Sequence, residues 1–583
     1  MYNKITAFPI TRKEKKMKEE LIISDIAAAV LEKDRLTSEV VVDKWRALAY
    51  ETPKYSGTLV WAATQCKPQP LTLPLKAKGK YHVYLGMINM GGDTTTGLRL
   101  SNDEAVSHVR TQGYGYWLSS EYIVENYWKT VDLDGKTALI ITKPDGCTAQ
   151  QSALVWLRLV PVDEQAETQK TPCIAYHLDL DYWAEDEYPT VQAATGRIKT
   201  FADGGTKLIL HEGYTLEENR EKAEDISVDG SLYPRASKYP SYFQRKEEFH
   251  QALVEASHGM GSEIYLTFRI QAGGFVAPHD AGGILQIFRE DWTDMQEFRC
   301  RTRDGRWMET CSFAYPEVRK KILDKIMSLM NVDFDGVSLL FHRGMFVAFE
   351  QPICDYVSEK YGVDARRLPA SDPRYNEAAS YFVTLFIREL RAQLDWRFSK
   401  RKGINVIVYH TPEASKNYGF DVETWINEGL IDGVSQGLMT VFEDLDGCYA
   451  DDGLIDLEKY TAKMKQTPTV CRDYSADPDL IEKGAKAFMK LCDGKVDFYA
   501  TLTWEHPDDA TIIDLADRLK KIGATQFISW NANHKAKFLN RINTEKFYIA
   551  GTKEEYGAKK AQYYRLLSIN GADVSQYSPN WKG

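Results

Sequence analysis

Acidic and histidine side chains stand at the carboxyl ends of several predicted strands. In the segment 173–181, alternation places His177 and Asp179 on one face, and the next predicted strand ends in His211 and Glu212. Carboxylates and imidazoles grouped in this way can donate and accept protons. Two carboxylates that flank a glycosidic bond are sufficient to cleave it, one as the acid and the other as nucleophile or base. The pattern therefore predicts acid–base chemistry on a polar substrate.

Three acids are candidates for the catalytic pair. Glu505 is expected at the inward end of the last predicted strand, Asp473 ends the strand before it, and Glu350 lies in the loop after the fourth strand. The other polar side chains at strand ends are expected to bind the substrate, and a tryptophan beside Glu505 offers a face on which a sugar ring can stack. These candidate binding residues are His177, Asp179, His211, Glu212, Arg269, His342, Arg343, His410, Gln436 and Trp504.

The elements that must position these residues alternate between strand and helix from residue 172 onward. Such alternation implies parallel strands joined by crossover helices, and eight strands predict a (β/α)8 barrel whose active site lies at the carboxyl ends of the strands. Amphipathic helices are expected over 317–330 and 378–394. The predicted strands lie near 173–181, 206–212, 263–269, 334–342, 404–410, 431–436, 469–473 and 496–505.

An all-β region precedes the barrel. Residues 39–162 carry short β-branched and aromatic runs separated by Gly, Asn and Asp, which is typical of a β-sandwich of the jelly-roll kind. The expected organisation is therefore a charged leader with a short helix over 1–38, the sandwich over 39–162, a catalytic barrel over 172–530, and an extension over 531–583 that packs on the barrel.

Composition narrows the function classes. Lys plus Arg number 73 and Asp plus Glu number 83, so the net charge of −10 argues against a protein that binds nucleic-acid backbones. No membrane-spanning run and no signal peptide are evident, so we expect no membrane partner and a cytoplasmic protein, or a secreted or periplasmic one if an upstream signal was removed. The expected partner is a carbohydrate substrate, with no cofactor and no metal, and the chain could form a homo-oligomer. The nine cysteines never form a CxxC pair and are expected to be buried thiols.

Two aspartates are assigned no chemistry. Asp335 and Asp432 precede glycines at the starts of predicted strands, which is the stability face of a barrel. We interpret both as turn or cap residues.

Five stretches carry a family resemblance: 298–305 (FRCRTRDG), 312–319 (SFAYPEVR), 334–344 (FDGVSLLFHRG), 349–352 with 359–362, and 421–433 (DVETWINEGLIDG). They resemble the family 10-like glycosyl hydrolases, which are bacterial barrel proteins. The similarity covers about 172–530, and the preceding sandwich looks like the accessory domain of such barrels. The resemblance implies a (β/α)8 glycoside hydrolase acting on a poly- or oligosaccharide.

The chain departs from this family at the fourth strand. Related barrels often carry Asp-Asp-Tyr after the Asp-Gly, whereas this sequence has Leu340, Phe341 and His342. Either Glu350 replaces the missing acid, or His342 and Arg343 bind an anionic sugar, or the barrel no longer hydrolyses its ligand. A guanidinium pair from Arg269 and Arg343 would suit a carboxylate or sulfate group, although an ion pair with a nearby glutamate explains them equally well.

Two rival hypotheses remain beside hydrolysis by two carboxylates. One is a metal-dependent barrel hydrolase or isomerase, because five N and O donors could bind zinc or manganese. The other is a glycan-binding protein whose barrel has lost catalysis. The donors that motivate the metal hypothesis are His177, Asp179, His211, Glu212 and His410.

Overall fold

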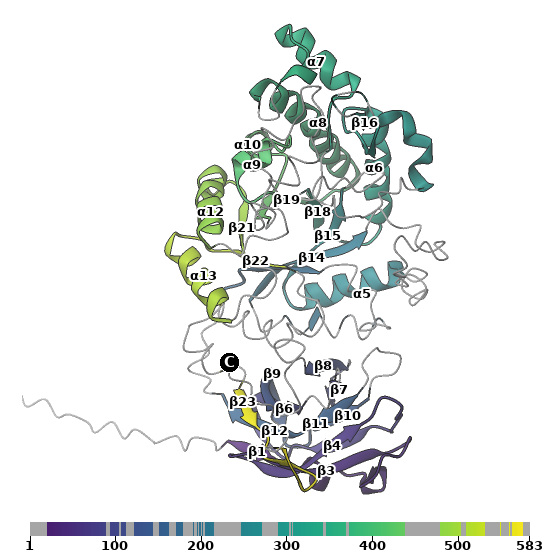
Figure 1. Cartoon of the computed structure of the whole chain (residues 1–583), viewed down its shortest axis with the longest axis vertical. Helices are drawn as coiled ribbons and strands as arrows, with labels where there is room; N and C mark the ends of the chain where they lie inside the picture. The colour runs from purple at the N-terminus through teal and green to yellow at the C-terminus, as the bar shows by residue number, and fades with distance from the viewer. Residues whose placement is uncertain are drawn as a thin grey trace, which may run out of the picture.

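A computed structural model gives the fold of the chain. It describes residues 20–88, 94–103, 106–111, 122–143, 151–162, 171–178, 191, 195, 198–199, 201, 205–214, 246–270, 290–301, 303, 305, 307–341, 346–368, 372–437, 478–502, 509–530, 549, 559 and 562–574. These residues form a β-sandwich and a barrel, which Figure 1 draws one below the other. The structure thus confirms a (β/α)8 barrel preceded by a sandwich.

The sandwich contains three antiparallel sheets in the described chain. Their strand orders are β1-β12-β6-β9-β23, β5-β10-β7-β8 and β11-β4-β3-β24-β25, and a short β2 pairs with β3. The strands are β1 Leu21–Ile23, β2 Leu36–Thr37, β3 Trp45–Glu51, β4 Ser56–Ala62, β5 Leu71–Pro74, β6 Lys78–Ile88, β7 Thr94–Leu100, β8 Ser107–Thr111, β9 Tyr122–Asp134, β10 Ala138–Thr142, β11 Ser152–Leu154, β12 Trp156–Pro161, β23 Gln562–Arg565, β24 Ser568–Ile569 and β25 Ala572–Asp573.

A buried charge cluster lies beside the sandwich core. The Glu125 carboxylate accepts two hydrogen bonds from Arg158, at 2.6 and 3.0 Å, and a third from the Trp156 indole at 2.8 Å. Gly86 makes room for the indole, because a Cβ atom there would lie 2.3 Å from the Trp156 ring. A bidentate pair with a third donor satisfies the buried carboxylate, as its 1% exposure requires.

Both outer boundaries of the sandwich differ from the prediction. The segment expected as a leader already belongs to it, because β1 pairs with β12 and the helix α1 Ile26–Ala29 contributes Ile26 to the core. The described part of the extension is divided between the two domains: Ile549 packs in the barrel core, whereas β23 pairs with β9 and β24 pairs with β3 of the sandwich. Each added strand covers a sheet edge whose backbone groups would otherwise lack partners.

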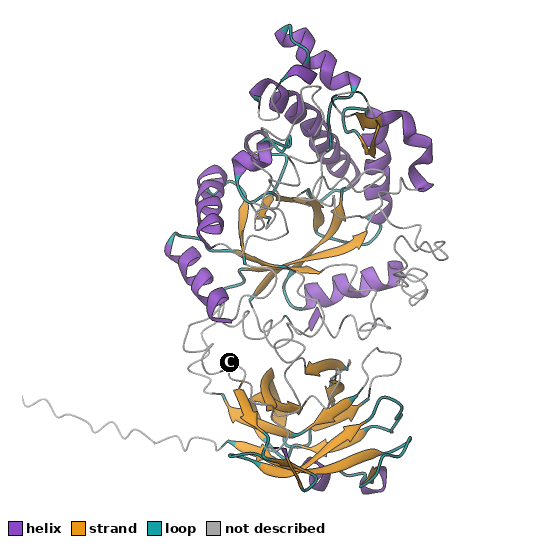
Figure 2. Ribbon diagram, in the orientation of Figure 1, coloured by secondary structure: helices purple, strands orange, loops and turns teal. Residues whose placement is uncertain are grey.

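The barrel is closed by eight parallel strands. They are β13 Ile174–Leu178, β14 Thr206–Tyr214, β15 Glu263–Arg269, β18 Gly336–Leu340, β19 Gly403–Val408, β20 Gly433–Gln436, β21 Asp497–Thr501 and β22 Phe527–Ser529, in that order around the barrel. Figure 2 shows these strands with helices around them.

The prediction was wrong about the last two barrel strands. β20 pairs directly with β21, so the barrel closes without the expected strand at 469–473, which lies outside the described residues. The strand expected as the eighth is the seventh, and the eighth is β22, which pairs with both β21 and β13. β22 was missed because it has only three residues, all apolar or small, and so shows no alternation of polar and apolar side chains.

Helices cover the barrel through a large apolar layer. Their inner faces pack on outward strand residues such as Ile209, Val337 and Val406. Helices α6 and α8 confirm the amphipathic segments predicted from the sequence, and each begins with Pro at its first turn. The helices are α5 Lys246–Gly259, α6 Pro316–Leu329, α7 Gln351–Tyr361, α8 Pro373–Arg397, α9 Pro412–Lys416, α10 Val422–Asn427, α12 Pro478–Cys492 and α13 Asp509–Lys521. The 3-10 turns are η1 Lys33–Arg35, η4 Glu290–Phe298 and η5 Ala365–Arg367. A hairpin pairs β16 Arg299–Arg301 with β17 Trp307–Cys311.

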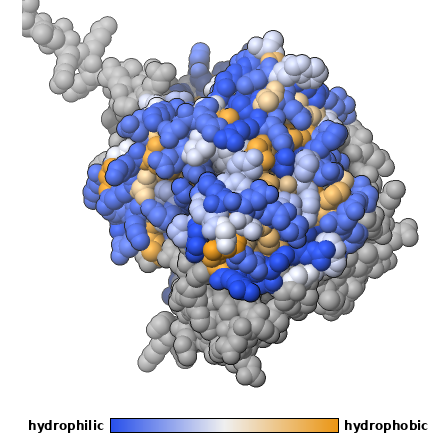
Figure 3. Space-filling model, turned by 90° about the horizontal axis from the view of Figure 1, so that it is seen from above, coloured by the Kyte–Doolittle hydropathy of each residue, from blue (hydrophilic) through white to orange (hydrophobic). Residues whose placement is uncertain are grey.

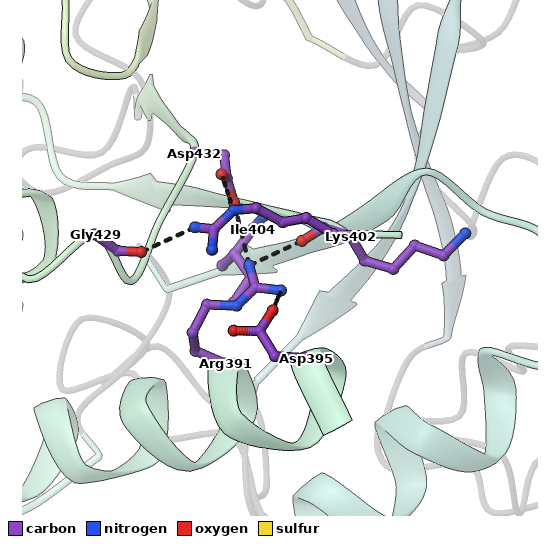
Figure 4. Close-up of polar contacts among 7 residues, drawn as sticks. Arg391, Asp395, Lys402, Ile404, Gly429 and Asp432 are labelled. Carbon is purple, nitrogen blue, oxygen red and sulfur yellow. Dashed lines mark hydrogen bonds and ion pairs between the residues drawn. The ribbon is translucent and has the colours of Figure 1, made fainter. Parts of the chain in front are cut away.

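The strand-start aspartates bind backbone N–H groups of neighbouring strands and basic side chains, whereas turn or cap roles were predicted. Asp432 accepts from the Ile404 N–H at 2.8 Å, from Arg401 Nε at 2.9 Å and from Arg391 Nη1 at 3.3 Å (Figure 4). Asp335 accepts from the Ile264 N–H at 3.0 Å. Both carboxylates therefore stabilise the amino-terminal face of the barrel.

The described surface is mainly polar. Seen from above, hydrophobic residues are scattered among hydrophilic ones (Figure 3). Within the described ranges, none of the helices combines the length and apolar character that crossing a lipid bilayer requires. The six described cysteines are all buried free thiols, as expected.

Candidate active site

The barrel interior is defined by a small apolar cluster. It contains at least one residue from most strands, and its members fix which strand positions face inward: Ala175, Leu208, Leu210, Tyr265, Leu340, Ile407, Tyr499, Ile528 and Trp530. Because side chains alternate along a strand, residues two positions away share the interior. By this rule most strands contribute a polar inward group, and Ser435 of β20 joins them through its hydrogen bond to Asn405. Eight such residues are nearly or fully buried: His177, Glu212, Thr267, Ser338, Asn405, Ser435, Thr501 and Trp530.

The strongest chemical feature of this interior is a histidine–glutamate pair. His177 Nε2 on β13 lies 3.3 Å from Glu212 Oε1 on β14, and the two side chains are 2% and 0% exposed. The His177 ring lies 5.0 Å from the Trp530 ring, measured between centroids. Trp530 Nε1 in turn donates to Thr501 Oγ1 at 2.7 Å. An acid, an imidazole and an indole therefore converge from β13, β14 and the residue after β22.

A hydrogen-bonded arc continues on the opposite strands. Ser435 Oγ donates to Asn405 Oδ1 at 3.1 Å, and Asn405 Nδ2 donates to Ser338 Oγ at 3.0 Å. Barrel interiors are usually filled with branched apolar residues, so three hydrogen-bonded polar side chains on neighbouring strands are unusual there. It leaves a polar interior that continues from β18 to β20.

Tyr265 and Tyr499 fill the interior toward the amino-terminal face. A Cβ atom on Gly336 would lie 2.8 Å from the Tyr265 ring, so a glycine is required where the phenol crosses the strand. Tyr499 hydrogen-bonds weakly to Asp497 at 3.5 Å, and Asp497 also pairs with Lys207 at 2.6 Å. Bulky aromatic groups thus fill the interior near the amino-terminal face, so the polar groups that could react lie toward the carboxyl ends of the strands.

Two predicted binding residues face away from the interior. His211 packs its ring against His250 of α5, with centroids 5.3 Å apart, because it has the opposite parity to Glu212. Gln436 follows the inward Ser435 and donates to the backbone carbonyls of His410 and Ile481, both at 3.0 Å. Both residues hold helices against strands rather than face the mouth, so their assignment to substrate binding was wrong.

For His410 and Arg269, the structure gives the position in the barrel but no contact with the interior. His410 follows β19 and is 6% exposed, and its carbonyl accepts the Gln436 bond already described. Arg269 ends β15 with inward parity, opposite Leu340 of β18, but its side chain lies outside the described atoms. Six other predicted residues lie outside the described residues altogether: Asp179, His342, Arg343, Asp473, Trp504 and Glu505.

Glu350 belongs to a different environment. It precedes α7 and is fully buried, and its carboxylate accepts from the Ser312 hydroxyl and from the Ala348 N–H at 2.9 Å. Burial raises the pKa of Glu350 to about 7, while the hydrogen bonds from Ser312 and from backbone N–H groups, including that of Arg301, act in the opposite direction. Its partners come from the hairpin and loops around α7, so it anchors that region; no contact in the described chain joins it to Glu212.

Sequence reasoning missed six of the eight polar residues of the interior. The search of strand ends found His177 and Glu212 but not Thr267, Ser435, Thr501 or Trp530. Asn405 and Ser338 sit in mid-strand, where a search of strand ends does not reach. The available signal was the i, i+2 spacing from apolar inward residues, such as Ser338 to Leu340 and Asn405 to Ile407.

Comparisons with known proteins gave structural matches alone. No family model and no curated protein sequence matches the chain, so the family resemblance stays a prediction. The chain is similar in structure to a cycloisomaltooligosaccharide glucanotransferase from Paenibacillus sp., at 11% identity and a TM-score of 0.34, with 75% of this chain and 51% of that one covered. It is also similar to the catalytic domain of a Paenibacillus polymyxa β-amylase (11%, TM-score 0.37, 66% and 98% covered) and to a Podospora anserina β-(1,4)-mannanase (10%, TM-score 0.29, 92% and 96% covered). The chain thus spans about half the length of the glucanotransferase.

Proposed function

We propose that the protein is a glycoside hydrolase that cleaves a poly- or oligosaccharide with two carboxylates at the carboxyl face of the barrel. One observation carries the proposal: Glu212 is inward and fully buried, and it pairs with His177 beside the Trp530 indole. A buried acid paired in this way is costly to keep, and a barrel supports catalysis at that end of its strands.

Glu212 supplies one carboxylate of the proposed pair. Glu505 follows the carboxyl end of β21, and Asp473 lies in the segment between β20 and α12; either is the proposed second acid. One group protonates the leaving oxygen, and the other attacks the anomeric carbon or activates water. His177 holds the Glu212 carboxylate in place, and Trp530 offers a sugar-stacking face.

An anionic sugar is the proposed substrate class within this function. Arg269 ends β15 with inward parity beside Glu212-bearing β14, so its guanidinium can balance a substrate carboxylate or sulfate. Arg343, which follows β18, is proposed as its partner. Uronic and sulfated glycans should then be cleaved in preference to neutral ones.

The test is a reducing-end release screen on neutral, uronic and sulfated polysaccharides, with and without chelator. We expect chelator-resistant release that falls about 100-fold or more in Glu212→Gln and Glu505→Gln. Glu423→Gln, an exposed acid in the first turn of α10, is the matched control and should retain activity. Release that persists in Glu212→Gln would remove this residue from the mechanism.

A second candidate is a barrel that binds glycans without cleaving them. Leu340 favours it, because this inward residue ends β18, where the related barrels are expected to carry an acid. Binding to one class of glycan in the screen, without any release, would establish this function instead.

A further inference from the structure

Thr267 has a buried hydroxyl with no hydrogen-bond partner among the described residues. The residue lies in the middle of β15, is 0% exposed, and has inward parity two positions after Tyr265. A buried hydroxyl without a partner is unfavourable, and a barrel interior can accept valine at such a position. A threonine here therefore calls for a partner that the described residues do not supply.

Both strand neighbours of Thr267 carry polar inward groups. In the register of the parallel strands, Thr267 pairs with Glu212 of β14 on one side and with Ser338 of β18 on the other. The Ser338 oxygen already accepts from Asn405 Nδ2, and Asn405 accepts from Ser435 Oγ. The donor direction of this arc runs from Ser435 toward Ser338, which leaves the Ser338 hydrogen free of that arc and able to point toward β15.

We propose that Thr267 is a positioning residue for Glu212: together with Ser338 it binds one internal water molecule, which donates a hydrogen bond to the Glu212 carboxylate. A water molecule suits this place because it needs two or more polar partners, and the three consecutive strands offer Ser338, Thr267 and Glu212. This water molecule donates a hydrogen bond to the Glu212 carboxylate from the side opposite His177, and so favours the ionised form of Glu212.

Another titratable group lies beside Glu212: His177 Nε2 on β13 is 3.3 Å from its carboxylate. Arg269 ends β15, and its side chain lies outside the described atoms. Tyr265 and Tyr499 lie in the same interior toward the amino-terminal face. These groups are the same in wild type and in a Thr267 variant, so a comparison of the two isolates the hydroxyl.

The first experiment measures unfolding rather than activity. In the full chain, Thr267→Val keeps the side-chain shape and removes the hydroxyl, whereas Thr267→Ser retains the hydroxyl. If the hydroxyl supports the ionised carboxylate, Thr267→Val should be less stable than wild type, and its deficit in Tm should grow as the pH rises through the titration of Glu212. Thr267→Ser loses a buried methyl group, so its Tm should be lower by an amount that does not depend on pH. A Thr267→Val protein that is as stable as wild type, or more stable, at every pH would overturn the proposal.

Ser257→Ala is the matched control, because Ser257 on α5 also has a fully buried hydroxyl without a partner in the described chain. Its Tm difference from wild type should not depend on pH. If Thr267→Val does not fold, Ser338→Ala takes its place and should show the same growing deficit. A pH-independent difference in Ser338→Ala would then count against the proposal.

The second readout rests on the proposed hydrolase function. With the glycan that gives the highest reducing-end release, the limb of the rate profile set by Glu212 should move up by about one pH unit in Thr267→Val and stay in place in Ser257→Ala. This is the acidic limb if Glu212 is the nucleophile or base, and the alkaline limb if it is the acid. If wild type releases no sugar from any glycan, the hydrolase proposal fails, while the unfolding measurement still decides the role of Thr267.

Discussion

The phenol of Tyr265 occupies the space that any side chain on Gly403 would need. A Cβ atom on Gly403 would lie 2.0 Å from the Tyr265 hydroxyl oxygen, although the two residues come from strands separated by β18. The Tyr265 side chain on β15 therefore packs directly against the backbone of Gly403 on β19, and a methyl group at position 403 has no room.

Gly403→Ala should destabilise the protein by about 1–3 kcal/mol, because the tyrosine ring must leave its position or the strands must separate. Tyr265→Phe removes the nearest oxygen and should recover part of this loss in the double variant. Gly259→Ala is the control, since nothing lies within 4 Å of the added atom, and it should be neutral. Urea unfolding measures all four proteins, and equal stability of Gly403→Ala and wild type would contradict the fit.

Glu350 should make the stability depend on pH near neutrality. Burial raises its pKa to about 7 from the ordinary 4.5, so the folded state binds a proton more tightly than the unfolded state does. The stabilisation is complete below pH 4.5 and is lost as the pH rises to about 7, with a total of roughly 3 kcal/mol. Glu350→Gln should lack this component, and the difference between the two proteins in chemical denaturation from pH 4.5 to 8 measures it. A flat difference would show that Glu350 titrates normally.

Breaking the buried ion pair of the sandwich should be costly. Glu125→Gln leaves the Arg158 guanidinium with only the more exposed Glu20 carboxylate, at 3.4 Å, and should lower stability by about 3 kcal/mol. Glu125→Leu combined with Arg158→Met removes both charges and should recover most of the loss. Thermal unfolding of the single and double variants distinguishes the two, and additive losses would show that the pair does not act as a unit.

Trp530 and Thr501 should act together if the barrel hydrolyses glycans. Trp530→Phe and Thr501→Val each remove the 2.7 Å hydrogen bond that holds the indole beside His177. Each should lower the rate of reducing-end release by about tenfold, and the double variant should lose little more. Independent, multiplicative losses would mean that the bond does not orient the indole.

The sequence predicted those parts of the barrel that depend on local pattern. Alternation on β13 identified His177, the position at a strand end identified Glu212 on β14, and the amphipathic pattern located α6 and α8. The errors came from long-range contacts. His211 is adjacent to Glu212 but belongs to the outer face, since a single position of register decides which side of the sheet a residue faces. Residues 562–574 carry apolar side chains, but a local pattern cannot name the strand that they pair with, and the sheet edges of β9 and β3 determine where they pair.

The pairing of β23 with β9 has a consequence for synthesis. The five-stranded sheet has β1 at one edge and β23 at the other, and the whole barrel lies between these two strands in the chain. On the ribosome, the sandwich therefore emerges first but waits for its last strand until the barrel has been translated. During this interval the edge of β9 lacks its partner, so the nascent sandwich is open to pairing with other chains or with a chaperone.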